Sequence, residues 1–505
     1  MNTTMTFRPR FLSATGLTLL GLPILFSPAS LHAVILLERN FTNLNLPLHD
    51  LDARADLHSF DFGDSTIDNL SVSVDIGGFS ATEPAYNGDY FISVANSGGG
   101  YAVLANRVGR SSTNAFGYGD NGFNVTFDDT AAHDIHTYRT VSGATPAYPQ
   151  PVTGTWQSSG RVALPGDVLD STARSASARL GSFDNTTATG DWWLTVEDTS
   201  TGGRGMLRSW GVQMGVTPQT SGGELKFIAG DRLQTKNGND LTLSNDLNLA
   251  GETSFVGSGN LRLQGKLRGS GKMVQSGGGS LILDEDSPDM SGAVEVRGGV
   301  LRVNNSSGSA TGSGAVTVFP GATLAGNGRV GGPVSFESGS FISPGASPGT
   351  QTYGDNLTWE GGATYLWEIN DAAGTRGADP GWDWIDVVGQ LTLDADSGNP
   401  FVIDLLSLDL SNEAGAIANF DGLSDYSWTL ASAGTIVGFD PDHVEIDASD
   451  FRTRNPDADG EISLVQSGNQ LDLLYTAVPE PGSYALVLGV GAIIIALRRR
   501  RTFRG

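Results

Sequence analysis

One short acidic segment carries oxygen ligands of the kind that calcium prefers. Asn455, Asp457 and Asp459 stand at alternate positions, and Gly460 follows them. An EF-hand calcium loop begins with the same order of side-chain oxygens and glycine. Its last position needs a bidentate glutamate, however, and Gln466 stands there. The sequence therefore leaves two predictions open, a calcium site or, as the strand-like flanking residues favour, a polar turn.

A second candidate site contains two tryptophans among acidic residues. Trp382 and Trp384 lie within five residues of chain that also contain Asp383 and Asp386. Indole faces can stack on sugar rings, so this pair predicts a carbohydrate contact. Tryptophans packed in a protein core would give the same pattern, and this alternative stays open.

No spacing in the chain assembles a catalytic set. Ser347 lies in a literal G-x-S-x-G, but Pro348 follows it and has no N–H for an oxyanion hole, which indicates a Ser-Pro turn. His133 and His136 are three residues apart, and without a helix or a third ligand we expect them in an exposed loop. We therefore name no catalytic residue, and the sequence leaves open whether the chain is an enzyme, with a non-catalytic protein favoured.

The composition excludes several classes of partner. The 505 residues carry 30 Lys+Arg against 55 Asp+Glu, a formal net charge of −25. Nucleic acids need basic patches that displace counterions, and anionic membrane surfaces need them too, so neither is an expected partner. The absence of cysteine excludes disulfides and thiolate metal sites. The 69 glycines with few charges favour many short strands joined by tight turns.

The first residues have the pattern of an export signal. Arg8 and Arg10 precede the mostly apolar segment Phe11–Phe26, and Leu31-His32-Ala33 offers a cleavage site with a small residue. This order predicts a secretory signal peptide over residues 1–33. A buried first helix or strand is the alternative.

The last residues have three parts in a fixed order. Pro479, Glu480 and Pro481 precede the uncharged segment Tyr484–Leu497, and four arginines follow: Arg498, Arg499, Arg500 and Arg501. The segment is short for a membrane-spanning helix, and the arginines would stop on the cytoplasmic side. The tail, residues 478–505, closely resembles the PEP-CTERM sorting signal. The resemblance implies export in a Gram-negative bacterium, transient anchoring in the inner membrane by a single sorting helix, processing by an exosortase, and a final place at the cell surface or outside the cell. A permanent tail anchor is the alternative.

Residues 34–218 alternate apolar and polar side chains as half-buried strands do. The most informative segments are Gly190–Asp198, with Trp192 and Trp193, and Gly205–Val212, with Trp210. These segments resemble the end of the P (Homo B) domain of proprotein convertases and bacterial subtilisin-like proteases. The resemblance implies a jelly-roll-like β sandwich that packs on a serine endopeptidase, and it places Asp128 and Asp129 where such domains hold acids near calcium. The chain has no matching catalytic domain, so the resemblance links it to proteolysis only through association with a separate protease.

Residues 219–345 contain a repeat. Leu241, Leu261, Leu281 and Leu301 recur every 20 residues, each at the start of a three-residue segment whose first and third residues are apolar. This period predicts stacked coils that bury leucine against the coils above and below. The segment resembles the autotransporter-associated β-strand repeat, which implies a right-handed β-solenoid. A glycine-rich linker is the alternative, although linkers keep no register.

Residues 346–477 continue with alternating segments and predict a C-terminal β cap. The predicted fold is therefore all-β. It comprises a sandwich, a solenoid, a cap and a sorting helix.

The leading functional hypothesis is a non-catalytic surface or extracellular-matrix protein with an adhesive or scaffolding role. The alternatives are a subunit that docks on a separate subtilisin-like protease and a module that binds extracellular polysaccharide. No cofactor is expected besides calcium.

Overall fold

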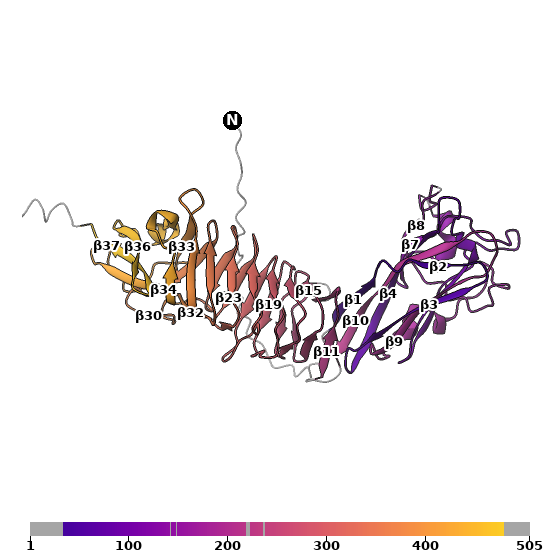
Figure 1. The fold of residues 1–505 in the computed structure, drawn as a ribbon, viewed down its shortest axis with the longest axis horizontal. Helices are drawn as coiled ribbons and strands as arrows, with labels where there is room; N and C mark the ends of the chain where they lie inside the picture. Colours follow the sequence, from indigo (N-terminus) through magenta and orange to yellow (C-terminus); the bar gives the residue numbers. More distant parts are fainter. Residues whose placement is uncertain (1–33, 142, 148, 219–222, 236–237, 479–505) are drawn as a thin grey trace, which may run out of the picture. The chain divides into compact units, whose positions relative to one another are not determined.

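The computed structural model describes residues 34–478 apart from 142, 148, 219–222 and 236–237, and strands dominate this part of the chain (Figure 1). The all-β class is thus confirmed. One α-helix, α1 (Ser449–Arg454), occurs among the described residues, together with five short 3-10 turns: η1 (Asn87–Asp89), η2 (Ile135–Thr140), η3 (Ala176–Ala178), η4 (Leu180–Phe183) and η6 (Pro441–His443).

The first region contains two sheets that share an aromatic core. In one sheet β10 pairs with β4 on one side and with β1 and β2 on the other, and β7 and β8 extend it beyond β4. The other sheet has the order β3-β9-β5-β6. Phe41 from the first sheet contacts Trp210 of the same sheet and Phe60 of the second sheet, and Phe60 stacks on Trp192. The strands are β1 (Ile35–Phe41), β2 (Leu46–Leu48), β3 (Ala53–Phe60), β4 (Ser65–Gly78), β5 (Tyr90–Asn96), β6 (Tyr101–Asn106), β7 (Phe123–Asp128), β8 (Val152–Trp156), β9 (Gly190–Asp198) and β10 (Gly205–Pro218).

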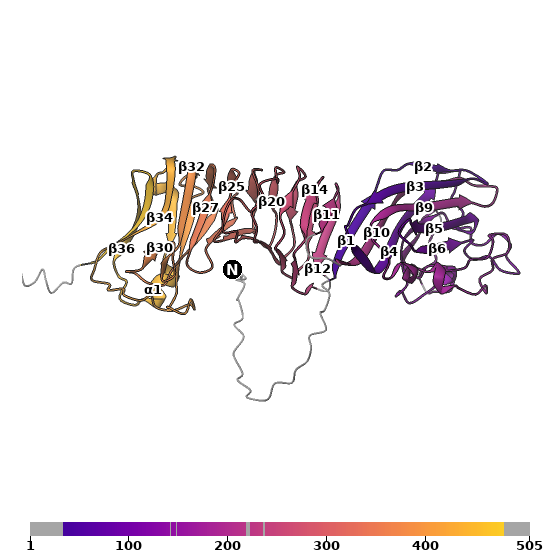
Figure 2. The same ribbon diagram turned by 90° about the horizontal axis from the view of Figure 1, so that it is seen from below.

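The next region is built from short parallel strands that pair in register with the strands of the following repeat (Figure 2). Leu241 pairs with Leu261, Leu261 with Leu281, and Leu281 with Leu301. All four leucines are buried, so the predicted 20-residue spacing is confirmed. Within each of these strands the residue that follows the leucine, such as Thr242 or Arg262, points outward because side chains alternate along a strand.

Most of these strands form three parallel ladders. One ladder contains β13 (Leu241–Leu243), β16 (Leu261–Leu263), β19 (Ser280–Leu283), β21 (Val300–Val303), β23 (Thr323–Gly326), β26 (Phe341–Pro344) and β29 (Thr364–Ile369). A second contains β12 (Asp231–Thr235), β15 (Thr253–Val256), β18 (Met273–Gln275), β20 (Val294–Val296), β22 (Val316–Val318), β25 (Val334–Phe336) and β28 (Leu357–Glu360). A short third contains β11 (Glu224–Phe227), β14 (Asp246–Leu249) and β17 (Leu267–Arg268).

Parallel pairing continues beyond residue 345 and ends in an antiparallel set. β29 pairs with β33, and β33 with β35, while β32 pairs with β34, all in parallel. The antiparallel strands β34, β37 and β36 close the region. The strands not yet given are β24 (Arg329–Val330), β27 (Thr350–Tyr353), β30 (Thr375–Arg376), β31 (Gly381–Trp382), β32 (Trp384–Asp394), β33 (Phe401–Ser407), β34 (Tyr426–Val437), β35 (Val444–Asp447), β36 (Glu461–Ser467) and β37 (Gln470–Thr476).

Strand β1 joins the first region to the parallel ladders. It lies between β10 and β12 and pairs antiparallel with both. Arg39 of β1 makes a buried bidentate ion pair with Asp231 of β12, and its guanidinium lies over the rings of Phe60 and Phe62. One sheet and one apolar core therefore run across the junction.

Candidate functional site

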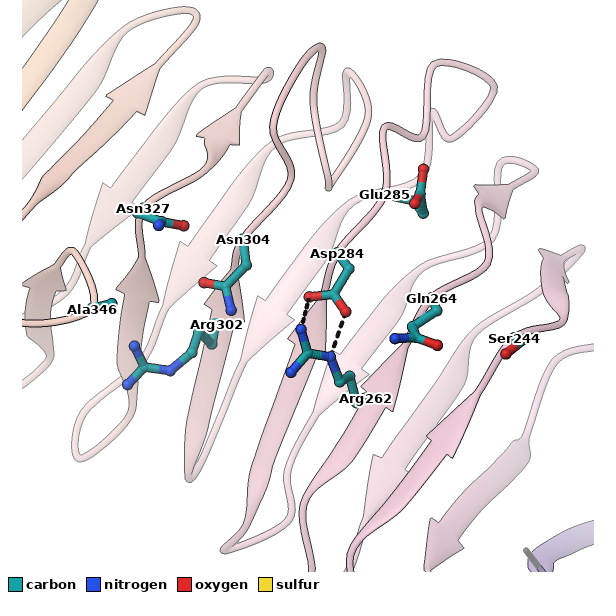
Figure 3. A pocket seen from close by; sticks show the side chains of 9 residues that line it. All are labelled: Ser244, Arg262, Gln264, Asp284, Glu285, Arg302, Asn304, Asn327 and Ala346. Carbon is teal, nitrogen blue, oxygen red and sulfur yellow. Dashed lines mark hydrogen bonds and ion pairs between the residues drawn. The ribbon is translucent and has the colours of Figure 1, made fainter. Parts of the chain in front are cut away.

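A polar groove follows the ladder that begins at β13 (Figure 3). Its cavity volume is about 930 Å³. Five of its residues come directly after successive strands of this ladder: Ser244 after β13, Gln264 after β16, Asp284 after β19, Asn304 after β21 and Asn327 after β23. We call these five residues the polar column. The column repeats because each of its residues directly follows a buried leucine, valine or glycine that ends a strand at the same point of the repeat.

The amides of the column differ from other asparagines in the same repeats. Within the described chain, the side-chain amides of Gln264, Asn304 and Asn327 make no hydrogen bond to protein. By contrast, Asn305 donates to the carbonyl of Ser307 at 2.8 Å and accepts from the N–H of Arg329 at 2.9 Å. Asn305 is thus satisfied internally, while the three column amides offer free donors and acceptors to the groove.

The charged residues of the groove balance one another. Arg262 donates to both carboxylate oxygens of Asp284, at 2.5 and 3.2 Å. Arg302 is half-buried and donates to the carbonyl oxygen of Gly345 at 3.3 Å; burial lowers its pKa, and the charge of Glu368 opposes this. With Glu285 included, the groove lining holds two cations and two anions.

Next to Ala346 in the chain, the loop at Ser347 contacts an acidic pair, the half-buried Glu368 and the buried Asp383. Ser347 has φ of +95°, a region that L side chains rarely adopt, and its hydroxyl hydrogen-bonds the carboxylate of Glu368. Burial raises the pKa of Glu368. Burial also raises the pKa of Asp383 well above its usual range, although Asp383 accepts from the N–H groups of Gly349 at 2.7 Å and Glu368 at 3.0 Å. The N–H of Gly349 already donates to Asp383, and Pro348 has no N–H to offer an oxyanion.

The first region holds a relay that sequence reasoning missed. His136 is buried, not exposed, so the prediction of an exposed loop was wrong for this residue, while His133 is exposed as expected. The Nδ1 of His136 lies 2.9 Å from Asp170, and the Nε2 of His136 lies 3.0 Å from the hydroxyl of Ser159. This is the order of a serine-histidine-aspartate triad, but Ser159 is fully buried and no substrate can reach it.

The environment of the relay indicates a structural role. Arg161 donates to Asp134 and to the carbonyl of Ser159, and Asp134 caps the turn that carries His136. Burial lowers the pKa of His136, and the Asp170 hydrogen bond opposes this. The network therefore holds together the three loop segments that contain His136, Ser159 and Asp170.

Asp128 and Asp129 lie at the end of β7 and serve as local hydrogen-bond acceptors. Asp128 accepts from the N–H and hydroxyl of Thr130, at 2.8 and 2.7 Å. Asp129 accepts from the hydroxyl of Ser158 at 2.6 Å and pairs with Arg179 at 3.4 Å. Their oxygens bind neighbouring loops to the strand.

Asn455, Asp457 and Asp459 do not converge. The side chain of Asn455 is buried and accepts from the N–H of Ile417, while Asp457 accepts from the N–H of Gly422 and Asp459 is exposed. No group of three or more histidine, cysteine or acidic side chains among the described residues is arranged to hold a metal ion. The segment forms the polar turn between α1 and β36.

Trp382 and Trp384 are both half-buried. The indole N–H of Trp382 donates to the carbonyl of Thr429 at 3.0 Å, and the guanidinium of Arg376 lies 4.6 Å over the ring of Trp384. Each indole therefore already has a protein partner on its ring or its N–H.

Three predictions lie outside the described residues: the sorting motif at Pro479, Glu480 and Pro481, the membrane stop at Arg498–Arg501 and the signal peptide over residues 1–33. Among the described residues, no helix is long and apolar enough to span a membrane.

No protein-family model matches the chain, and comparison with curated proteins finds no match either.

Proposed function

We propose that this chain is a non-catalytic exported protein of the cell surface or extracellular matrix, with an adhesive or scaffolding role. The polar column carries the proposal, since the same outward position holds a polar group in successive repeats and the amides of Gln264, Asn304 and Asn327 there have no protein partner within the described chain. A repeated, open surface suits adhesion to an extended partner. The two serine arrangements that could suggest an enzyme are blocked, one by burial and one by its backbone.

The proposed architecture is a P-domain-like jelly roll followed by a right-handed β-solenoid. The in-register parallel ladders support the solenoid, and the buried Trp192 and Trp210 support the sandwich. In this proposal β1 covers the first coil, and the antiparallel strands β34, β37 and β36 cap the last. Such caps prevent edge-to-edge association of chains.

Delivery is proposed to follow the PEP-CTERM route, with an exosortase acting on the tail. Replacing Pro479, Glu480 and Pro481 with alanine should leave export intact and block processing, because the apolar segment and Arg498–Arg501 remain. Fractionation of an exosortase-bearing Gram-negative host should then find the variant in the inner membrane. Normal release of the variant would overturn this route.

The adhesive role is tested by measuring whether the exported chain stays on the cell surface or in the matrix. Cells that export the full chain should keep it on their surface or in their matrix, and washed matrix from cells lacking it should recapture the added protein. Protein that remains free in the medium would overturn the proposal. Recovery of the chain in a stoichiometric complex with a protease would favour a protease-associated subunit instead.

A further inference from the structure

We propose that the polar groove binds one neutral polysaccharide chain, which runs across the strands so that successive sugar units meet successive members of the polar column. The inference rests on the proposed adhesive function and names the ligand of that surface.

The geometry of the column favours a linear polymer. Neighbouring strands lie about 4.8 Å apart, so the five column residues present one polar group at each step of this length. A sugar ring in an extended glycan occupies a similar length. The groove volume of about 930 Å³ gives room for several rings rather than one small molecule.

The chemistry of the column favours hydroxyl groups. An amide side chain supplies both donors and an acceptor, and a sugar hydroxyl is likewise both donor and acceptor. Gln264, Asn304 and Asn327 have no protein partner within the described chain, so they bind a ligand without first breaking an internal hydrogen bond. Figure 3 shows these amides along the groove, on either side of the Arg262–Asp284 pair.

The charges favour a neutral polymer over a charged one. Arg262 is already paired bidentately with Asp284, and Arg302 and Glu285 leave the lining without net charge. The whole chain carries a formal charge of −25, which repels polyanions at long range. An anionic glycan would need surplus cations that the lining lacks.

A peptide fits this surface less well. Peptides that add to a sheet pair with an exposed edge strand, whereas the groove lies over strands that are paired on both sides. Side-chain recognition of a peptide would also need apolar pockets, and the lining is polar apart from Ala346.

The test is affinity electrophoresis of the full exported chain in gels that contain one polysaccharide each. Hydroxyethylcellulose, galactomannan and dextran are the neutral probes, and alginate is the anionic probe. We expect retardation in at least one neutral gel. The double variant Gln264→Ala/Asn304→Ala should bind about thirtyfold more weakly, since its two lost hydrogen bonds are worth about 1 kcal/mol each.

The matched control is Ser254→Ala/Thr317→Ala, which removes outward polar groups from β15 and β22 in another ladder and should bind like the parent chain. Circular dichroism checks that all variants are folded. Absence of retardation in every neutral gel, retardation by alginate alone, or equal retardation of the Gln264/Asn304 variant and its control would each overturn the inference. If matrix retention persists in any of these cases, the adhesive function stands and only its assignment to a neutral glycan in this groove fails.

Discussion

At the scale of single residues, two carboxyls of the first region are buried, and their burial makes ionisation unfavourable. Asp89 and Asp198 are almost fully buried, and Arg107 approaches Asp89 only to 3.9 Å. Burial raises the pKa of Asp89 to about 6 and that of Asp198 to about 7, from 3.8. A carboxyl with a raised folded-state pKa contributes stability that is full below pH 3.8 and lost as the pH rises through the folded value.

Asp198→Asn should therefore raise the melting temperature at pH 8, where the parent chain must bury a charge. The gain should be a few degrees and should shrink at pH 5, where Asp198 is already protonated in the folded state. Calorimetry at the two pH values measures it. The exposed Asp167→Asn is the control and should change little at either pH. An equal gain for Asp198→Asn at both values would rule out desolvation as the cause.

At the scale of elements, the parallel ladder divides each strand into an inward and an outward side. Leu281 of β19 is buried between Leu261 and Leu301, while its neighbour Ile282 faces outward and is half-buried. Leu281→Ala should cost about 2–5 kcal/mol of unfolding free energy through lost burial and a cavity. Ile282→Ala should cost less than about 1.5 kcal/mol. Urea unfolding followed by far-ultraviolet circular dichroism compares them, and similar costs would contradict the register.

Elements with a short period could be predicted from sequence, and contacts between loops could not. The leucine ladder was predictable because alternation within a strand and the 20-residue period are both local patterns. The burial of His136 was not, because its partners Ser159 and Asp170 lie 23 and 34 residues away in segments without periodicity.

The polar column was present in the sequence as one polar residue after each repeated strand. It gives no repeated motif in the sequence, because its members are serine, glutamine, aspartate and asparagine, which share a position in the repeat and polar chemistry but not residue identity. The aromatic pair Trp382 and Trp384 drew the carbohydrate prediction instead, since indole rings are the more familiar signal.

At the scale of the whole described chain, β1 connects the first region to the parallel ladders in one continuous sheet. Its two antiparallel pairings are reinforced by the Arg39–Asp231 ion pair, whose partners lie 192 residues apart in sequence. Burial raises the pKa of Asp231, and Arg39 opposes this, so the carboxylate depends on its partner. We therefore expect the parent chain to unfold in a single calorimetric transition.

Arg39→Met should separate that transition into two. Methionine keeps apolar contact with Phe60 and Phe62 but leaves the Asp231 carboxyl buried without a cation, at a cost of about 3–5 kcal/mol. The double variant Arg39→Met/Asp231→Asn should recover part of the loss, because an uncharged amide can still accept from the N–H of Ile228. Differential scanning calorimetry of the three chains measures both effects. Two well-separated transitions in the parent chain would show that the continuous sheet does not couple the regions. A double variant as unstable as Arg39→Met would show instead that the lost guanidinium contacts, rather than the unpaired carboxyl, carry the cost.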